Sequence, residues 1–140
     1  MGASSSIDSI PQRHIHVTVP SGTQFDNRIS ILIERLTSYH FAVSKTNQDF
    51  QLEHGENIID KSHIVLHCVC KKTISSYSQL REIDIAKQKS KQVVCVVLED
   101  LLEGRNIIID NKDNIEYKNT QQIDNVITYL GTNFAKIDNF

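Results

Sequence analysis

Hydrophobic residues recur along the chain in two alternating patterns, short β-branched runs and longer stretches with helical spacing. The run HIHVTV at 14–19 stops at Pro20, Ser21 and Gly22, which predicts a strand followed by a turn. A helix is predicted next, because one face carries apolar residues at helical spacing: Phe25, Ile29, Leu32, Ile33 and Leu36. Residues 40–44 are a short strand candidate, and residues 51–60 a weak helix interrupted by Gly55.

Two nearly continuous apolar runs mark the centre of the fold. Residues 63–70 (HIVLHCVC) and 92–99 (QVVCVVLE) have the pattern of strands buried on both faces of a parallel sheet. Between them, Ser76 and Gln79 have the spacing of a capping box, which predicts the start of a helix. Its apolar side is expected to carry Leu80, Ile83 and Ala86.

The C-terminal third is predicted to add one strand and one helix. Residues 106–110 (NIIID) read as the last strand, and the polar stretch 111–120 is open between a loop and a hairpin arm. A final helix ending near Gly131 is indicated by Ile123, Val126, Ile127 and Leu130. This alternation predicts one α/β domain over residues 13–140, a flavodoxin-like three-layer sandwich with a five-stranded, mostly parallel sheet and helices on both faces.

Composition and charge argue against several classes of protein, namely nucleic-acid-binding, disulfide-rich and membrane-spanning proteins. The chain has 140 residues, a formal net charge of -2 and no basic stripe with interleaved aromatics, so nucleic acid is not an expected partner. Three cysteines lie in apolar runs, which favours reduced core thiols and a cytoplasmic protein over a disulfide framework. Neither a bilayer-spanning run nor a secretory signal is visible.

The first twelve residues are expected to form a flexible tail with one short motif. MGASSS matches the myristoylation pattern, with Gly2 exposed after removal of Met1 and Ser6 at the required spacing. A frayed, Ser-rich terminus explains the same residues equally well. Because one acyl chain anchors only marginally and no cysteine or basic cluster lies nearby, lipidation would imply weak, reversible membrane attachment.

The central segment DKSHIVLHCVCKKTISSYSQLREIDIAKQKSKQVVCVVLED resembles the hallmark stretch of Toll/interleukin-1 receptor (TIR) domains. Ser62 precedes the third strand, Ser76 lies six residues before Glu82, and Ala86 follows four residues later. The resemblance extends over roughly residues 13–134. It implies an intracellular signalling module that associates with other TIR domains or with itself, in a family where some members cleave NAD⁺ at the nicotinamide–ribose bond.

In the TIR enzymes, the glutamate at the position of Glu82 is catalytic. A fixed carboxylate can hold the ribose hydroxyls and stabilise the oxocarbenium-like ribose left when neutral nicotinamide departs. The resemblance therefore implies NAD⁺ as a possible substrate, with no cofactor. The alternative is an ordinary carboxylate near a helix N-terminus. For catalysis, Glu82 should lie at the carboxyl-end rim of the sheet, between the loops after Val19 and Cys70, with Ile85 and Ala86 as its apolar border.

Other site residues follow from the same resemblance. Phe25, Asp26, Ser76 and Tyr77 are the candidates for the substrate pocket, although the family's frequent tryptophan and cysteine are replaced by Ser78 and Gln79. Association is expected through segment 45–56 and the Glu82 helix. Within that segment, Phe50 is an apolar anchor in a polar rim, and Gly55 is the possible match to a family loop glycine.

Three other kinds of site find little support. A metal site could be imagined from His14, His16, His67 and Cys68, but these alternate on buried strands and lack the ligand spacing of structural zinc sites. No P-loop or GxGxxG motif is present. A response-regulator receiver would need an aspartate after the third strand, where the chain has Cys70, Lys71 and Lys72.

Overall fold

The structure is a computed structural model that describes residues 13–20, 25–46, 52–73, 76–99 and 114–138. Its centre is one sheet, whose strands are β1 (His14–Thr18), β2 (Ala42–Lys45), β3 (Ile64–Val69), β4 (Gln92–Val97) and β5 (Asn114–Glu116). Their order is β2-β1-β3-β4-β5, and every neighbouring pair is parallel. The predicted α/β class is confirmed, as is the adjacency of the two apolar runs, now β3 and β4.

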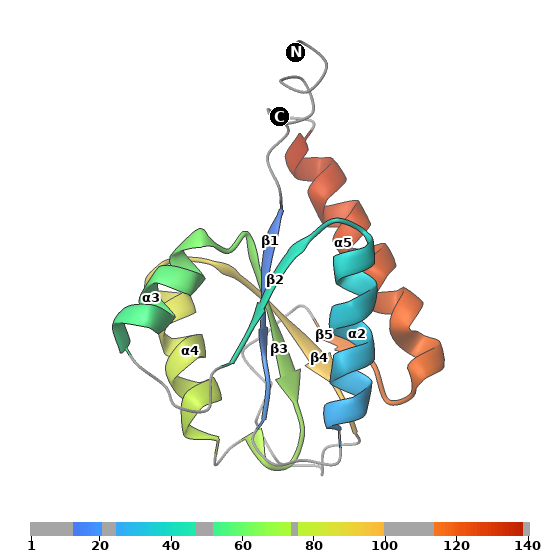
Figure 1. Cartoon of the computed structure of the whole chain (residues 1–140), viewed down its shortest axis with the longest axis horizontal. Coiled ribbons are helices and arrows are strands. Elements are labelled where there is room, and N and C mark those ends of the chain that lie inside the picture. Colours follow the sequence, from blue (N-terminus) through green and yellow to red (C-terminus); the bar gives the residue numbers. More distant parts are fainter. Residues whose placement is uncertain (1–12, 21–24, 47–51, 74–75, 100–113, 139–140) are drawn as a thin grey trace.

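Helices cover both faces of this sheet (Figure 1). On one face lie α2 (Asp26–Ser38) and α5 (Ile123–Asp138), the latter preceded by a 3₁₀ turn, η2 (Thr120–Gln122); on the other lie α3 (Leu52–Lys61) and α4 (Tyr77–Gln88). No helix in the described ranges combines the length and apolarity needed to cross a bilayer.

The two faces of the sheet are chemically different. Because side chains alternate along a strand, Ile15 and Val17 of β1 enter the large core under α2 and α5. The intervening His16 and Thr18 are buried on the opposite face, and His67 of β3 joins them there. The hydrophobic cluster beneath α3 and α4 is small, built on Ile59, Val65, Ile85 and Ala86. Part of this second interface is therefore polar.

Two expectations for the C-terminal third need revision. The strand predicted at 106–110 falls outside the described residues, and β5 instead comes from the polar stretch whose structure the sequence left open. Ile115 of β5 is buried against the main core, which explains how a three-residue strand is held. The predicted helix end near Gly131 is wrong, because α5 continues to Asp138 and its buried Phe134 prolongs the apolar face.

The start of α4 also differs from its prediction. Ser76 occupies the N-cap position, but its hydroxyl makes no capping hydrogen bond. Gln79 is turned into the sheet, where its amide nitrogen donates to Thr18 Oγ1 at 3.0 Å and to the Cys68 carbonyl at 2.6 Å. Leu80 is exposed, so the expectation for this residue is wrong, whereas Ala86 is buried and Ile83 packs against the smaller hydrophobic cluster. The buried residues of α4 are Ser78, Gln79, Glu82, Ile85 and Ala86.

Candidate active site around Glu82

Glu82 is buried between α4 and the sheet, with only 3% of its surface exposed. Thr46, directly after β2, donates its hydroxyl to Glu82 Oε1 at 2.6 Å. The same hydroxyl oxygen accepts the backbone N–H of Val19 at 2.7 Å, at the end of β1. One threonine thus ties the carboxyl ends of β1 and β2 to the carboxylate on α4. Glu82 does not point into bulk water, which removes the simplest case for an ordinary surface residue.

The second carboxylate oxygen faces His16. His16 Nε2 lies 3.1 Å from Glu82 Oε2, and the ring is almost fully buried. On its other side, His16 Nδ1 is 2.7 Å from the hydroxyl of Ser44 on β2. The Nε2 atom has no hydrogen bond of good alignment, so its contact with Glu82 is close in distance but bent in angle. Both oxygens of Glu82 nevertheless have a polar neighbour.

A second cluster of buried polar side chains, Thr18, His67 and Gln79, lies on the same face of the sheet. Thr18 Oγ1 is 2.7 Å from His67 Nδ1 and accepts the Gln79 amide described above. Burial, with a smaller contribution from Lys87, lowers the pKa of His67 to about 4. His67 is therefore a neutral imidazole at physiological pH. Two buried oxygens near the start of α4, Gln79 Oε1 and Ser76 Oγ, have no hydrogen-bond partner.

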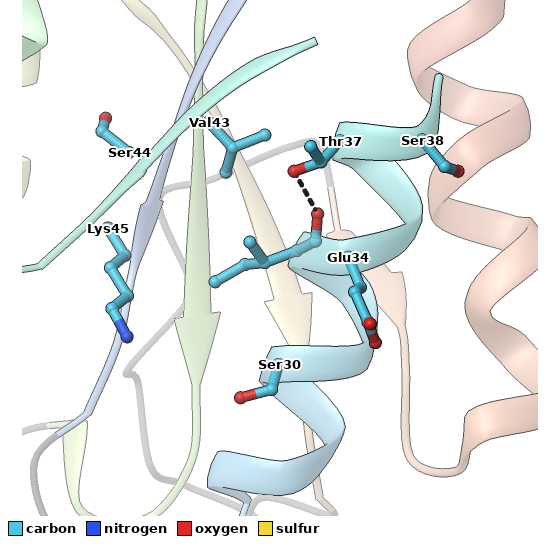
Figure 2. Close-up of a pocket in the computed structure, with 8 residues that line it drawn as sticks. Ser30, Glu34, Thr37, Ser38, Val43, Ser44 and Lys45 are labelled. Carbon is cyan, nitrogen blue, oxygen red and sulfur yellow. Dashed lines mark hydrogen bonds between the residues drawn. The ribbon is translucent and has the colours of Figure 1, made fainter. Parts of the chain in front are cut away.

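Two adjoining cavities lie beside β2. The larger, of about 540 Å³, runs between α2 and β2 and is lined by residues of both, among them Ile33, Val43 and Ser44 (Figure 2). The smaller, of about 300 Å³, lies at the carboxyl ends of β1 and β2 and includes Asp26 and Thr46 in its wall. Ser30, Ile33 and Lys45 line both cavities. Ligands of parallel sheets commonly bind at the carboxyl ends of the strands, where the smaller cavity lies.

The expected pocket residues lie in different parts of the structure, and one of them, Asp26, is linked to Glu82 through Thr46. Asp26 shares a cavity wall with Thr46, which contacts Glu82. Ser76 is buried at the N-cap of α4. Phe25 belongs to the main core on the opposite face, with the Arg28 guanidinium 5.0 Å from its ring centroid. Tyr77 is 67% exposed at the first residue of α4.

The residues expected to mediate association are only partly described. Gly55 is buried within α3, whereas Phe50 and the lipidation candidate Gly2 lie outside the described residues. The border predicted for Glu82 is present, since Ile85 and Ala86 are both buried.

The sequence interpretation did not connect Glu82 with His16 and Thr46, which contact its carboxylate, or with Ser44, which contacts His16. It considered His16 only for a metal site. The signal for these residues was alternation: His16 and Thr18 are polar positions within a strand whose other face is apolar, and Ser44 and Thr46 repeat the pattern at the end of β2. A buried strand with one polar face needs polar partners, and a helix carrying glutamate and glutamine can supply them. Across the described ranges, no three His, Cys, Asp or Glu side chains converge as a metal site would require.

Similarity to known proteins lies in structure and not in sequence. No protein-family model matches the chain, and no curated protein matches it. A solved TIR domain heterodimer of RPS4 and RRS1 superimposes with a TM-score of 0.66 at 10% identity, covering 86% of this chain and 97% of that one. The CMP N-glycosidase BcmB of Clostridium botulinum gives 0.59 at 14% identity, covering 81% and 98%. The CheY-like protein TadZ of Pseudomonas aeruginosa gives 0.55 at 16% identity, covering 85% and 99%.

At these identities the comparisons show the fold. The chain has the architecture shared by a TIR domain, a nucleotide N-glycosidase and a CheY-like protein. Such a fold serves several unrelated functions, so the function has to be argued from the side chains.

Proposed function

We propose that this chain is a TIR-like module that works by associating with other TIR-like domains or with itself. The observation that carries the proposal is an exposed apolar pair on the first turn of α4, formed by Tyr77 and Leu80, which are 67% and 46% exposed. They are three residues apart and therefore neighbours on the helix surface. The TIR heterodimer among the structural neighbours supports association as the use of such a surface.

The pair is unusual within the described part of the chain. There, one other large hydrophobic side chain is exposed, Tyr39, which follows α2 on the opposite side of the sheet and is 53% exposed. Tyrosine is enriched among the residues that dominate binding energy at interfaces, because it buries a large area at a small entropic cost. Tyr39 thus offers a matched control of similar exposure away from α4.

The test is concentration-dependent self-association of purified protein, measured by light scattering coupled to size-exclusion chromatography. Replacing both Tyr77 and Leu80 with serine should raise the dissociation constant by about 10³-fold, since interface anchors contribute roughly 2 kcal/mol each and about 1.4 kcal/mol corresponds to tenfold. Tyr39→Ser should leave it unchanged. Wild-type protein that stays monomeric at every concentration and captures no TIR-like domain would contradict the proposal. Equal weakening by Tyr39→Ser would refute the choice of surface.

Two further association proposals concern residues outside the described ranges. Phe50→Ala should also weaken self-association if segment 45–56 contributes to the same contact. Lipidation of Gly2 would add weak, reversible membrane attachment. Incubation with a myristoyltransferase and mass spectrometry should show the added acyl chain on wild type and none on Gly2→Ala.

A second candidate function is cleavage of the nicotinamide–ribose bond of NAD⁺, with Glu82 as the catalytic carboxylate. The specific observation in its favour is the burial of Glu82 at the carboxyl ends of β1 and β2, with a hydroxyl on one oxygen and an imidazole beside the other. A carboxylate held in this way can stabilise positive charge on ribose. The resemblance of the fold to an enzyme named as a CMP N-glycosidase supports the same reaction class.

The chemistry requires one bond to break and one to form. The glycosidic electron pair leaves with nicotinamide, which departs neutral, and the cationic ribose carbon is stabilised by the nearby carboxylate. Water then adds to that carbon and releases one proton. In this scheme Asp26 and Ser76 remain the candidates for contacts to the rest of the nucleotide, and NAD⁺ is a substrate with no cofactor.

Nicotinamide release should be measured on assembled protein at high concentration. Glu82→Gln keeps the shape of the side chain and removes its charge, so turnover should fall to background while the melting curve still shows a folded domain. Asp84→Asn is the matched control, because Asp84 is an exposed carboxylate on the same helix whose 3.7 Å contact with Arg81 lies at the surface. Wild type without turnover would refute this function and leave the association proposal intact.

A further inference from the structure

The relevant geometry is a line of side chains that runs from the edge of the sheet to Glu82. Ser44, half-buried on the edge strand β2, contacts His16 Nδ1 at 2.7 Å, and His16 Nε2 lies 3.1 Å from Glu82 Oε2. The other oxygen of Glu82 accepts from Thr46 at 2.6 Å. Ser44 and Thr46 are alternate residues and so project to the same side of the sheet. The position of β2 therefore controls both oxygens of the carboxylate.

Strand register explains why these groups meet. His16 of β1 is the direct neighbour of Ser44 in the parallel pairing of β1 with β2. Their side chains stand side by side on the face that α4 covers, where Glu82 projects from the helix. Ser44, His16 and Glu82 come from distant parts of the sequence, and 28 positions separate His16 from Ser44.

For a neutral His16 ring, the chemistry of the atoms fixes the direction of the hydrogen bonds. A neutral imidazole has one donor and one acceptor, and an ionised carboxylate only accepts. If the proton were on Nδ1, the Nε2 lone pair would face the lone pairs of Glu82 Oε2 at 3.1 Å. With the proton on Nε2, Ser44 donates to Nδ1 and Nε2 faces an acceptor. A buried N–H without an acceptor is costly, which favours the arrangement in which Nε2–H faces the carboxylate.

We infer that His16 is a positioning residue for Glu82 and that Ser44 sets its tautomer, so that the edge strand holds the carboxylate in one orientation. This inference rests on the glycosidic cleavage proposed above for its catalytic consequence. The lone pairs of Glu82 that remain would then stay in one place for the ribose. Displacement of a catalytic group by about 1 Å can lower a rate by about 10²-fold.

The hydrogen-bond line can be tested without any activity. Nitrogen-15 NMR of the histidine rings should show His16 as a neutral imidazole with its proton on Nε2. Ser44→Ala should shift the Nδ1 resonance toward that of an unbonded ring nitrogen, and Glu82→Gln should shift Nε2. Ser38→Ala is the control, because its hydroxyl donates to the Arg35 carbonyl at the surface and should leave the His16 ring unchanged. An imidazolium, or a proton on Nδ1, would overturn the inference.

Kinetics then test positioning against a merely structural role. His16→Leu should lower kcat by about 10²-fold with little change in KM, the expected result when a group acts only in the transition state. His16→Gln, whose amide can still donate toward Glu82, should recover part of the loss. His63→Leu, at a histidine whose Nδ1 accepts the exposed His14 backbone N–H, should have no effect on kcat.

The outcomes separate the two proposals. If the His16→Leu protein is folded and keeps its kcat, or if His16→Gln is no better than His16→Leu, the positioning role is overturned. If wild type has no turnover, glycosidic cleavage is refuted, and the NMR measurement alone decides whether Ser44 and His16 orient Glu82.

Discussion

Lowering the pH from 7 to 4 should destabilise this domain through one buried histidine, His67. Its imidazole is 6% exposed, and Nδ1 lies 2.7 Å from the Thr18 hydroxyl. Burial lowers its pKa to about 4, whereas the ordinary value is 6.5. Between these two pH values the imidazole is protonated in the unfolded chain but stays neutral in the folded domain. The free energy of unfolding therefore has its full value above pH 6.5 and decreases as the pH falls toward 4.

The size of the effect follows from the two pKa values. Each tenfold difference in proton affinity corresponds to about 1.4 kcal/mol, so the shift from 6.5 to about 4 amounts to roughly 3 kcal/mol. A domain of this kind has a total stability of about 5–15 kcal/mol. The loss is thus large enough to measure by urea unfolding at a series of pH values.

The decisive comparison is between wild type and His67→Gln, because both carry every other titrating group. The variant should start from a lower stability at pH 7 and lose about 3 kcal/mol less than wild type on acidification. His54→Gln, at an exposed position of α3, should follow the wild-type curve. Parallel pH dependences for wild type and His67→Gln would refute the reasoning and show that His67 is protonated in the folded state.

Three further outcomes are expected. Gln79→Ala should destabilise the domain by about 1–3 kcal/mol in urea unfolding, because the Cys68 carbonyl loses its 2.6 Å donor and keeps only the longer contact of 3.5 Å with the Thr73 hydroxyl. An unchanged midpoint would contradict the network. Cys68 should react with a thiol reagent only on unfolding, since burial raises its pKa to about 12, and fast labelling of the native protein would count against its burial. Phe134→Ala should cost about 3–5 kcal/mol if α5 packs beyond Gly131 as described, whereas a change under 1 kcal/mol would place Phe134 outside the core.

Much of the fold was readable from local pattern alone. The runs at 63–70 and 92–99 are apolar at almost every position, and such strands are stable only when both faces are covered, so their place at the centre of a parallel sheet followed directly. The helix Asp26–Ser38 was equally plain, because its apolar residues repeat at helical spacing. Glu82 could be singled out through the resemblance to TIR domains, to which its spacing from Ser76 belongs, although that resemblance did not separate a buried carboxylate from a solvated one.

The surroundings of Glu82 were decided only by tertiary structure. His16, Ser44 and Thr46 come from two strands that pair in parallel, and register between strands is set by how whole faces pack. The buried face of α4 shows the same rule, since Gln79 and Glu82 are buried while Leu80 is exposed. Local hydrophobicity placed Leu80 on the buried side with Ile83 and Ala86. Leu80 is exposed instead, because the polar side of β1 leaves buried donors and acceptors that need partners, and Gln79 and Glu82 of α4 provide some of them.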